Sequence, residues 1–330
     1  IFKFAHCSTT QQKSETFSFA FLRLCNADGS LIANGPYELG TYAFRADLTP
    51  HMYLEEDKLK CTPRKEKFRL IATFCSNLMT PNSYLHKLLN RDIFADQITS
   101  TLRQFSTIPS IEVAKFFVKL MDSLLQILVD SARDTTHQLV YIAILILLCM
   151  KPNKAGFVNY KQVVREYVSQ RNLPDSCHRQ LCNELTFYLS YVDSAKNSSL
   201  CTMSVQAFDL VLELILRSRK LFLSSRSNLE QDYFKPEISK VLDCFCGFML
   251  RDKPDWVVGS QVRGILTFIE LFATNLNEVF TPMELGIFVK KFVESVTGSY
   301  VRSYLTIPKL TLVVRLVKSP LLMEPEARPV

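Results

Sequence analysis

Residues 68–81, FRLIATFCSNLMTP, contain the change of periodicity that decides the fold. From Phe68 to Phe74 the aromatic and aliphatic side chains occupy every second position, which is the pattern of a half-buried β-strand. Beyond this stretch the apolar residues recur every three or four positions, as they do on one face of an α-helix. We therefore expect a β region over residues 1–76 and a helical region over residues 77–330.

Three segments upstream support the β region. Residues 17–21 alternate Phe with Ser and Ala, and residues 37–44 are expected to form another strand. Between them lie turn sequences at 26–30 and 33–36, where Asn, Asp and Gly accept positive φ and Pro fixes its own φ. The faces of these strands are only half polar, as the packed sheets of a partial antiparallel β-sandwich allow. Residues 1–4 already resemble an apolar strand, so we expect the chain to be cut from a longer polypeptide.

Residues 54–67 are rich in charge and are expected to form a long exposed loop around Pro63. The candidate contacts for acidic lipid head groups in this segment are Lys58, Lys60, Arg64, Lys65 and Lys67. Clustered cations of this kind attract an anionic leaflet by roughly 1 kcal/mol each. The alternative is a solvated loop, and it is favoured because Glu55, Glu56, Asp57 and Glu66 cancel much of the positive field.

The helical region contains two clear amphipathic stripes, one from Val205 to Ile215 and one from Val262 to Leu276. Thr281 to Glu284 form a capping box with proline in the first turn, which predicts the start of a helix. Further helices are expected at 92–106, 110–131, 135–150, 157–170, 175–192, 233–251 and 308–318, with breaks at Pro109, Pro152, Pro174, Pro254 and Pro308.

Paired helices at a spacing of roughly 40 residues suggest a stack of the HEAT or armadillo kind. No repeated consensus is present. The predicted fold class is therefore mainly α, an armadillo-like or HEAT-like stack preceded by a partial β-sandwich. Such a stack buries side chains between nearest neighbours and presents a long surface for other domains or partners.

Composition excludes several classes of protein. A chain of 330 residues that is 48% hydrophobic and 22% charged is folded, and its nine glycines argue against a glycine-loop nucleotide enzyme. The net charge of +7 is spread along the chain, so we expect no nucleic-acid partner. The ten cysteines lie inside apolar runs, which indicates a reducing, cytoplasmic compartment. Residues 139–150 are too short to cross a membrane and are expected to form a buried helix.

No residue pattern predicts catalysis or cofactor binding. The strongest metal candidates, Cys177, His178 and Cys182 with the Cys244/Cys246 pair, match no zinc spacing, so we interpret them as packing residues. The five histidines lack an accompanying nucleophile motif, and neither GxxxxGK[ST] nor GxGxxG occurs. A second basic group, Arg217, Arg219, Lys220 and Arg226, is expected to stabilise the C-terminal end of its own helix.

The order of these segments resembles one known family. Residues 15–24 with the 28–39 turns and strand resemble the end of the lipid-binding sandwich of the DOCK (dedicator of cytokinesis) family, and residues 68–82 resemble its closing strand and exit into helices. Fainter similarity continues through 216–222 and 279–285, so the resemblance spans nearly the whole chain in one order. It is strongest to the branch that acts on Rac-type GTPases with an ELMO-type adaptor.

The resemblance implies different roles for the two regions of the chain. Residues 1–76 would be the C-terminal part of a C2-like lipid-binding sandwich, and residues 77–330 an armadillo-like scaffold. The family's guanine-nucleotide exchange domain lies beyond the stack, so no exchange residue, cofactor or metal ligand is assigned here. The implied partners are a Rac-type GTPase bound elsewhere in the parent, an ELMO-type adaptor and a phosphoinositide membrane surface; dimerisation of the parent stays open.

The leading hypothesis is thus a non-enzymatic scaffold segment of a Rac-directed exchange factor in engulfment and cell migration, cytoplasmic and recruited to the plasma membrane. The alternative is a free-standing helical-repeat adaptor that binds peptide or protein partners.

Overall fold

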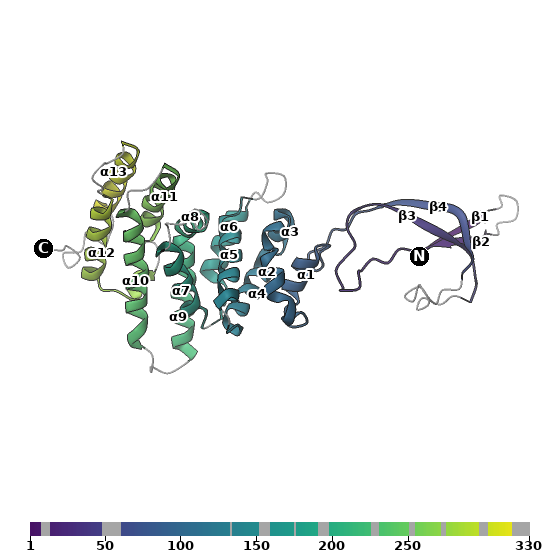
Figure 1. The fold of residues 1–330 in the computed structure, drawn as a ribbon, viewed down its shortest axis with the longest axis horizontal. Helices are drawn as coiled ribbons and strands as arrows, with labels where there is room; N and C mark the ends of the chain where they lie inside the picture. The colour runs from purple at the N-terminus through teal and green to yellow at the C-terminus, as the bar shows by residue number, and fades with distance from the viewer. Residues whose placement is uncertain are drawn as a thin grey trace. The chain divides into compact units, whose positions relative to one another are not determined.

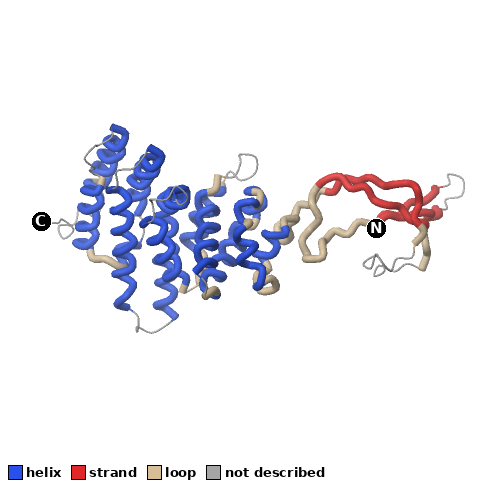
Figure 2. The backbone as a smooth tube through the Cα atoms, viewed as in Figure 1, coloured by secondary structure: helices blue, strands red, loops and turns tan. Residues whose placement is uncertain are grey.

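The computed structural model describes residues 1–7, 14–47, 61–132, 134–151, 159–174, 176–190, 198–225, 231–250, 255–271, 275–296 and 303–318. They form two compact units, Ile1–Lys87 and Leu88–Val330. The first unit holds the strands and the second holds nearly all of the helices (Figure 1, Figure 2). A mainly α fold preceded by antiparallel strands is confirmed. The first unit includes the segment after the last strand, which hydrogen-bonds to residues 28–34.

The first unit is built on one antiparallel sheet with the strand order β1-β2-β3-β4. Its strands are β1 (Phe2–Cys7), β2 (Ser14–Ala20), β3 (Gly35–Ala43) and β4 (Pro63–Ala72). β3 and β4 pair along most of their length, whereas β2 and β3 pair at only two positions. The edge strands also touch, since the ring of Phe68 in β4 lies 5.0 Å from the rings of both Phe2 and Phe4 in β1. The sheet is therefore strongly curled.

The expectation of a loop through residue 67 is wrong at its C-terminal end. β4 begins at Pro63, and Arg64, Lys65 and Lys67 lie on the strand. The physical reason is that β4 is an edge strand: proline can occupy its first residue, where no ladder N–H is needed, and its charged side chains remain in solvent. Residues 48–60 lie outside the described residues.

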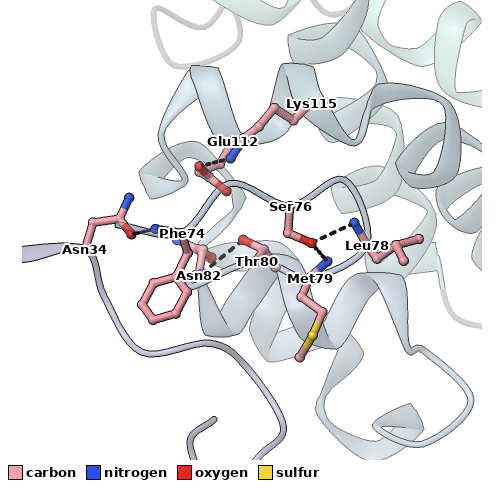
Figure 3. A network of polar contacts seen from close by, with 9 residues as sticks. All are labelled: Asn34, Phe74, Ser76, Leu78, Met79, Thr80, Asn82, Glu112 and Lys115. Carbon is pink, nitrogen blue, oxygen red and sulfur yellow. Dashed lines mark hydrogen bonds and ion pairs between the residues drawn. The ribbon is translucent and has the colours of Figure 1, made fainter. Parts of the chain in front are cut away.

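Side-chain oxygens hold the segment that follows β4. Asn34 Oδ1 accepts a hydrogen bond from the Phe74 amide at 2.8 Å, Ser76 Oγ accepts from the Leu78 amide at 3.1 Å, and Thr80 Oγ1 accepts from the Asn82 amide at 3.1 Å (Figure 3). These bonds satisfy backbone donors that have no strand or helix partner.

The predicted turn at 26–30 is confirmed and is tied to the first helix. Asp28 accepts from the Ser30 amide at 2.9 Å, from Ser30 Oγ at 2.6 Å and from Ser83 Oγ at 2.7 Å. These hydrogen bonds lower the pKa of Asp28 to about 2. Gly29 has φ +87°, and a Cβ at this position would lie 3.2 Å from Nε2 of His86.

The helical elements are α1 (Ser83–Leu89), η3 (Ala95–Gln97), α2 (Ile98–Arg103), η4 (Phe105–Thr107), α3 (Ser110–Lys115), α4 (Phe117–Asp130), α5 (Asp134–Cys149), α6 (Tyr160–Gln170), α7 (Cys177–Ser190), α8 (Ser198–Gln206), α9 (Phe208–Ser225), α10 (Gln231–Leu250), α11 (Asp255–Leu271), η5 (Asn275–Glu278), α12 (Pro282–Ser295) and α13 (Ser303–Val317).

The helices of the second unit, here called the helical stack, repeat with a period of three. Helix α5 contacts α2 and α8, and α8 contacts α11; likewise α7 contacts α4 and α10, and α6 contacts α9. At the C-terminal end the period falls to two, with contacts α10–α12 and α11–α13. The stack predicted from the helical periodicity is present, but its repeating unit up to α11 is a helix triplet and not the expected pair of about 40 residues.

Several predicted helix boundaries are wrong. The helix expected at 92–106 is broken into η3, α2 and η4, and the helix expected at 110–131 is interrupted at Phe116, between α3 and α4. The helix break predicted at Pro308 is absent, because Pro308 lies inside α13. There, burial of Leu312 and Leu316 in a helix that packs on α11 outweighs the local cost of the proline.

The capping box at Thr281 is confirmed. Thr281 Oγ1 accepts from the Glu284 amide at 3.4 Å, and Glu284 Oε2 accepts from the Thr281 amide at 2.8 Å. Lys235, whose Nζ lies 2.6 Å from Glu284 Oε1, is the main reason that the pKa of Glu284 falls to about 2.

Of the apolar residues 139–150, all but Met150 lie in α5. Val140, Tyr141, Ile144 and Leu147 of this helix are fully buried, as expected. An aromatic ladder connects the later helices: Phe208 stacks on Phe245 at 4.2 Å, Phe245 on Phe292 at 5.4 Å, and Phe292 on Phe268 at 3.6 Å between ring centroids.

In the described part of the chain, no single helix has the length and apolar character needed to cross a membrane. Only α8 and α9 taken together meet that requirement, and they are bent by 67° at the break between them.

Candidate functional site

Three of the five predicted lipid contacts are placed by the structure. Arg64, Lys65 and Lys67 are exposed on β4, while Lys58 and Lys60 lie outside the described residues. Lys67 and Arg69 lie on one face, where both contact Glu38 of β3, whereas Arg64 lies over the ring of Phe17 in β2. Lys65 is exposed at the irregularity in the β3–β4 pairing between Pro63 and Lys67. The structure thus separates cations that the sequence pattern had grouped in one loop.

From Lys67 onward the pairing is regular, so Lys67, Arg69 and Ile71 share one face of β4. Ile71 is 80% exposed. Glu38 of β3, paired in register with Arg69, lies 2.5 Å from Lys67 Nζ and 2.8 Å from Arg69 Nε. Their hydrogen bonds lower the pKa of Glu38. No local sequence pattern singles out Glu38 or Arg69, because only the register of β3 against β4 brings them together.

On the other face, Arg64 interacts with its own neighbours. Its Nε lies 3.2 Å from Glu66 Oε2, and its guanidinium lies over the ring of Phe17 at 5.2 Å. The guanidinium of Arg64 is therefore mainly engaged in contacts within the sheet. Within the sheet unit, the surface best suited to attract an anion is the exposed face of β4 with Lys67, Arg69 and Ile71, together with the exposed Lys65 beside it; we call it the β4 face.

The second basic group has a different role from the one predicted. Arg217, Arg219 and Lys220 lie before the last turn of α9 and do not stabilise its own C-terminus; Arg226 lies outside the described residues. Instead, Arg217 donates to the carbonyl oxygen of Val168 and, at 2.8 Å, to that of Arg171. These carbonyls belong to the C-terminal end of α6, so the cation stabilises a neighbouring helix end.

Arg219 is nearly buried in a polar and aromatic cluster. It is 5% exposed, and its guanidinium lies 5.2 Å from the ring centres of both Phe222 and Phe234. His178 packs edge-on against the same two rings, and its backbone amide donates to Ser218 Oγ at 3.2 Å. The cluster joins α7, α9 and α10, which makes it a structural contact between neighbouring helices.

The cysteine candidates for metal binding are also packing residues in the structure. Cys177 and Cys182 are buried, and burial raises the pKa of Cys182. Cys246 is buried as well, with a pKa raised to about 12, while Cys244 lies 3.3 Å from Ser190 Oγ. Within the described ranges, no group of three or more His, Cys, Asp or Glu residues is arranged to hold a metal ion.

The described histidines make structural contacts. His137 Nε2 lies 2.7 Å from the carbonyl oxygen of Ser131, and His178 packs in the cluster described above. His86 lies beside Gly29. The side chain of His6 and all of His51 lie outside the described residues.

Comparison with known proteins agrees with this architecture. A sequence model of the dedicator of cytokinesis (DOCK) TPR region matches residues 94–330. Over 99% of its length the chain is similar to dedicator of cytokinesis protein 4 of Mus musculus and of Homo sapiens and to dedicator of cytokinesis protein 3 of Homo sapiens, with 22% identity in each case.

The chain spans 17% of the length of each of these relatives. The family match covers nearly all of the helical stack, and the similarity to the curated relatives continues through the sheet. The chain therefore belongs to the DOCK family, and its helical stack is the family's TPR region.

Proposed function

We propose that this chain is the scaffold segment of a DOCK-type guanine-nucleotide exchange factor for a Rac-family GTPase. Its sheet takes part in recruitment to phosphoinositide-bearing plasma membrane, and its stack sets the distance to an exchange domain elsewhere in the parent. An ELMO-type adaptor is the expected partner, and cytoskeletal remodelling in engulfment and migration is the expected process. The mechanism is geometric: recruitment raises the effective concentration of the exchange domain near a lipid-anchored GTPase.

The observation that carries the scaffold role is the continuity of the stack core. Two series of contacting helices run through the stack, α2–α5–α8–α11–α13 and α4–α7–α10–α12. The aromatic ladder links α9, α10, α12 and α11. Arg217 adds a polar connection between α9 and the end of α6. Since packed interiors resist compression and transmit strain, a core of this kind keeps the separation between its two ends constant.

Support for membrane recruitment comes from the β4 face. Three cations and an 80% exposed isoleucine combine electrostatic attraction with an apolar contact for the interface. Glu38 neutralises part of this charge, so the affinity of this face for anionic lipid should depend on that carboxylate.

A nucleotide-release assay tests the scaffold role. Added to Rac loaded with fluorescent GDP, the 330-residue chain should leave the release rate at its intrinsic value. A clear acceleration would show that the chain itself has exchange activity and would overturn the scaffold assignment.

Vesicle sedimentation tests the membrane role. The chain should bind vesicles that contain phosphatidylinositol trisphosphate more tightly than vesicles of phosphatidylcholine alone. The triple variant Lys65→Glu/Lys67→Glu/Arg69→Glu should bind at least about tenfold more weakly, since each cation near an anionic surface contributes about 1 kcal/mol. Glu38→Gln should bind more tightly, because it unmasks two cations.

The matched control is Lys119→Glu/Lys240→Glu/Lys290→Glu, which makes the same charge change at exposed positions on α4, α10 and α12 in the stack. It should bind like the unaltered chain. Equal binding of both vesicle types, or equal effects of the two triple variants, would contradict a role for the β4 face.

A further inference from the structure

The helical stack contains a basic pocket that neither the family match nor the proposed function explains. It has a volume of about 270 Å³ and lies where α5, α6, α9 and α11 meet. Its lining includes Lys151, Lys161, Arg165 and Arg263 against a single carboxylate, Asp209. Lys161 and Arg165 lie one turn apart on α6, Lys151 follows the end of α5, and Arg263 belongs to α11. The packing of α11 against the earlier helices therefore brings a distant fourth cation to three that are close in the sequence.

The charges of this pocket surround the end of α5. Burial raises the pKa of the Cys149 thiol to about 11. Asp209 also raises this pKa, whereas Arg263 and Lys151 lower it. Cys149 is therefore a protonated thiol at neutral pH and not a nucleophile. The chemistry that the pocket can provide is the binding of a charged group by its cations.

A second, apolar pocket adjoins the first. Its volume is about 410 Å³, and its lining includes Phe105, Ile108, Val113, Ile146 and Met203 from η4, α3, α5 and α8 and the segment between η4 and α3. The two pockets share three lining residues, Cys149, Met150 and Gln206. Basic and apolar surfaces thus continue into each other across the C-terminal end of α5.

The combination restricts the ligand. Four cations against one carboxylate select an anion, and the adjoining pocket offers burial to an aliphatic or aromatic side chain. A bilayer is a flat surface and does not fill two concave sites on one helical stack. Nucleic acid requires an extended track of positive charge, whereas this one ends at an apolar wall. A peptide chain, with side chains of both kinds a few residues apart, fits both pockets.

We propose that this double pocket binds an acidic peptide segment of a partner protein, with its carboxylates against Lys161 and Arg263 and an apolar side chain among Ile146, Met203 and Phe105. Such a site would use the stack as a docking surface in addition to any role as a spacer. The proposal does not depend on exchange activity or membrane binding.

Fluorescence anisotropy tests the proposal on the 330-residue chain. The probe is a fluorescein-labelled twelve-residue peptide with a central Phe-Leu pair flanked by Glu and Asp. It should bind saturably, and more weakly as salt is raised, because its charges are partly screened. If the peptide shows no saturable binding up to about 1 mM, the proposal is overturned, because a dissociation constant above this value is too weak for a specific site.

Charge reversal locates the binding. Lys161→Glu/Arg263→Glu should weaken binding at least about tenfold, equivalent to about 1.4 kcal/mol. Both side chains are exposed, so the fold should be retained, as circular dichroism and thermal melting would verify. The matched control Lys119→Glu/Lys290→Glu makes the same charge change at exposed positions on α4 and α12, outside both pockets, and should bind like the unaltered chain. Equal loss in both double variants would mean general charge attraction and overturn the site.

Two further arms test the apolar pocket and the class of ligand. A probe with Ser-Ser in place of Phe-Leu, and the variant Met203→Ser with the original probe, should each bind several-fold more weakly. An unchanged affinity in both would overturn the two-pocket model. Phosphatidylserine vesicles or single-stranded DNA that bind as tightly as the peptide, with the same loss on Lys161→Glu/Arg263→Glu, would overturn the assignment to a peptide.

Discussion

The sheet unit and the helical stack are stabilised in different ways. Among the described residues of the sheet unit, Phe19 is the one aromatic side chain that is fully buried, and many polar contacts are exposed, such as Glu38 with Lys67 and Arg69. The stack fully buries many large side chains, among them Tyr141, Phe208 and Phe268, and links its helices through stacked rings. We infer that the stack depends on side-chain burial and the sheet on its backbone ladder and turns, so the two should respond to different substitutions.

The largest expected effect is in the stack, at Phe292. Its ring stacks on Phe268 at 3.6 Å and on Phe245 at 5.4 Å, and it is fully buried. Phe292→Ala should lower the free energy of unfolding by about 3–5 kcal/mol and the melting temperature by roughly 10 °C. Scanning calorimetry is the measurement. Phe292→Leu should cost clearly less, and an alanine effect below about 1 kcal/mol would contradict a core held by this ladder.

The next effect should come from Arg217, which tests whether charged hydrogen bonds between neighbouring helices matter in the stack. Arg217→Ala leaves carbonyls at the end of α6 without their charged donor and should cost about 2 kcal/mol in urea unfolding. The control is Lys220→Ala, which removes an exposed ion pair of 2.8 Å with Glu278 and should cost less than about 1 kcal/mol. Equal costs would mean that Arg217 has no special role at the end of α6.

A smaller effect is expected in the sheet unit at Gly29. Its φ of +87° is unfavourable for a residue with a Cβ, and that Cβ would lie 3.2 Å from Nε2 of His86. Gly29→Ala should therefore cost about 1–2 kcal/mol, and proteolysis should show the loss in residues 1–87 with the stack still resistant. Gly40→Ala, at a strand position without positive φ, is the control. Simultaneous loss of protection in both units would contradict their independence.

The smallest effect concerns pH and the stack alone. Burial raises the pKa of Glu184 in α7 to about 7, and its Oε2 atom has no hydrogen-bond partner in the described part of the chain. An acid with a raised pKa in the folded state destabilises the fold as pH rises from the unfolded pKa through about 7, and it has no such cost at lower pH. Glu184→Gln should therefore raise the melting temperature by roughly 3 °C at pH 8 and by little at pH 4. A gain of equal size at both pH values would show that ionisation is not the cause.

Local sequence patterns predicted the elements that depend on neighbouring residues. Alternation predicted β2, β3 and the second half of β4, the Asn-Asp-Gly sequence predicted the turn at Gly29, and the Thr281 capping box predicted the start of α12. Each of these signals is complete within a few residues, so no knowledge of packing is required. The resemblance that suggested the DOCK family depends on the same collinear segments, and the family is confirmed.

The errors arose where packing overrides local preference. Pro63 starts a strand because it is placed on a sheet edge, and Pro308 is accepted within α13 because that helix is packed against α11. Helix 110–131 is interrupted at Phe116, a buried residue, although nothing in the local pattern predicts a break there. The division into 1–76 and 77–330 and the C2-like character of the sheet stay predictions.

The sequence by itself determined the class of the protein: an alternating β segment, then amphipathic helices, in the order found in one family. Only the tertiary structure decided which charges meet. It placed Arg217 at the end of a helix 46 residues away, paired Glu38 with cations on β4, and gathered Lys161 and Arg263 into one pocket. The physical reason is the sequence separation over which each effect acts. Periodicity is set by backbone geometry over a few residues, whereas the partners of a charged side chain are set by helix and strand packing across the whole fold.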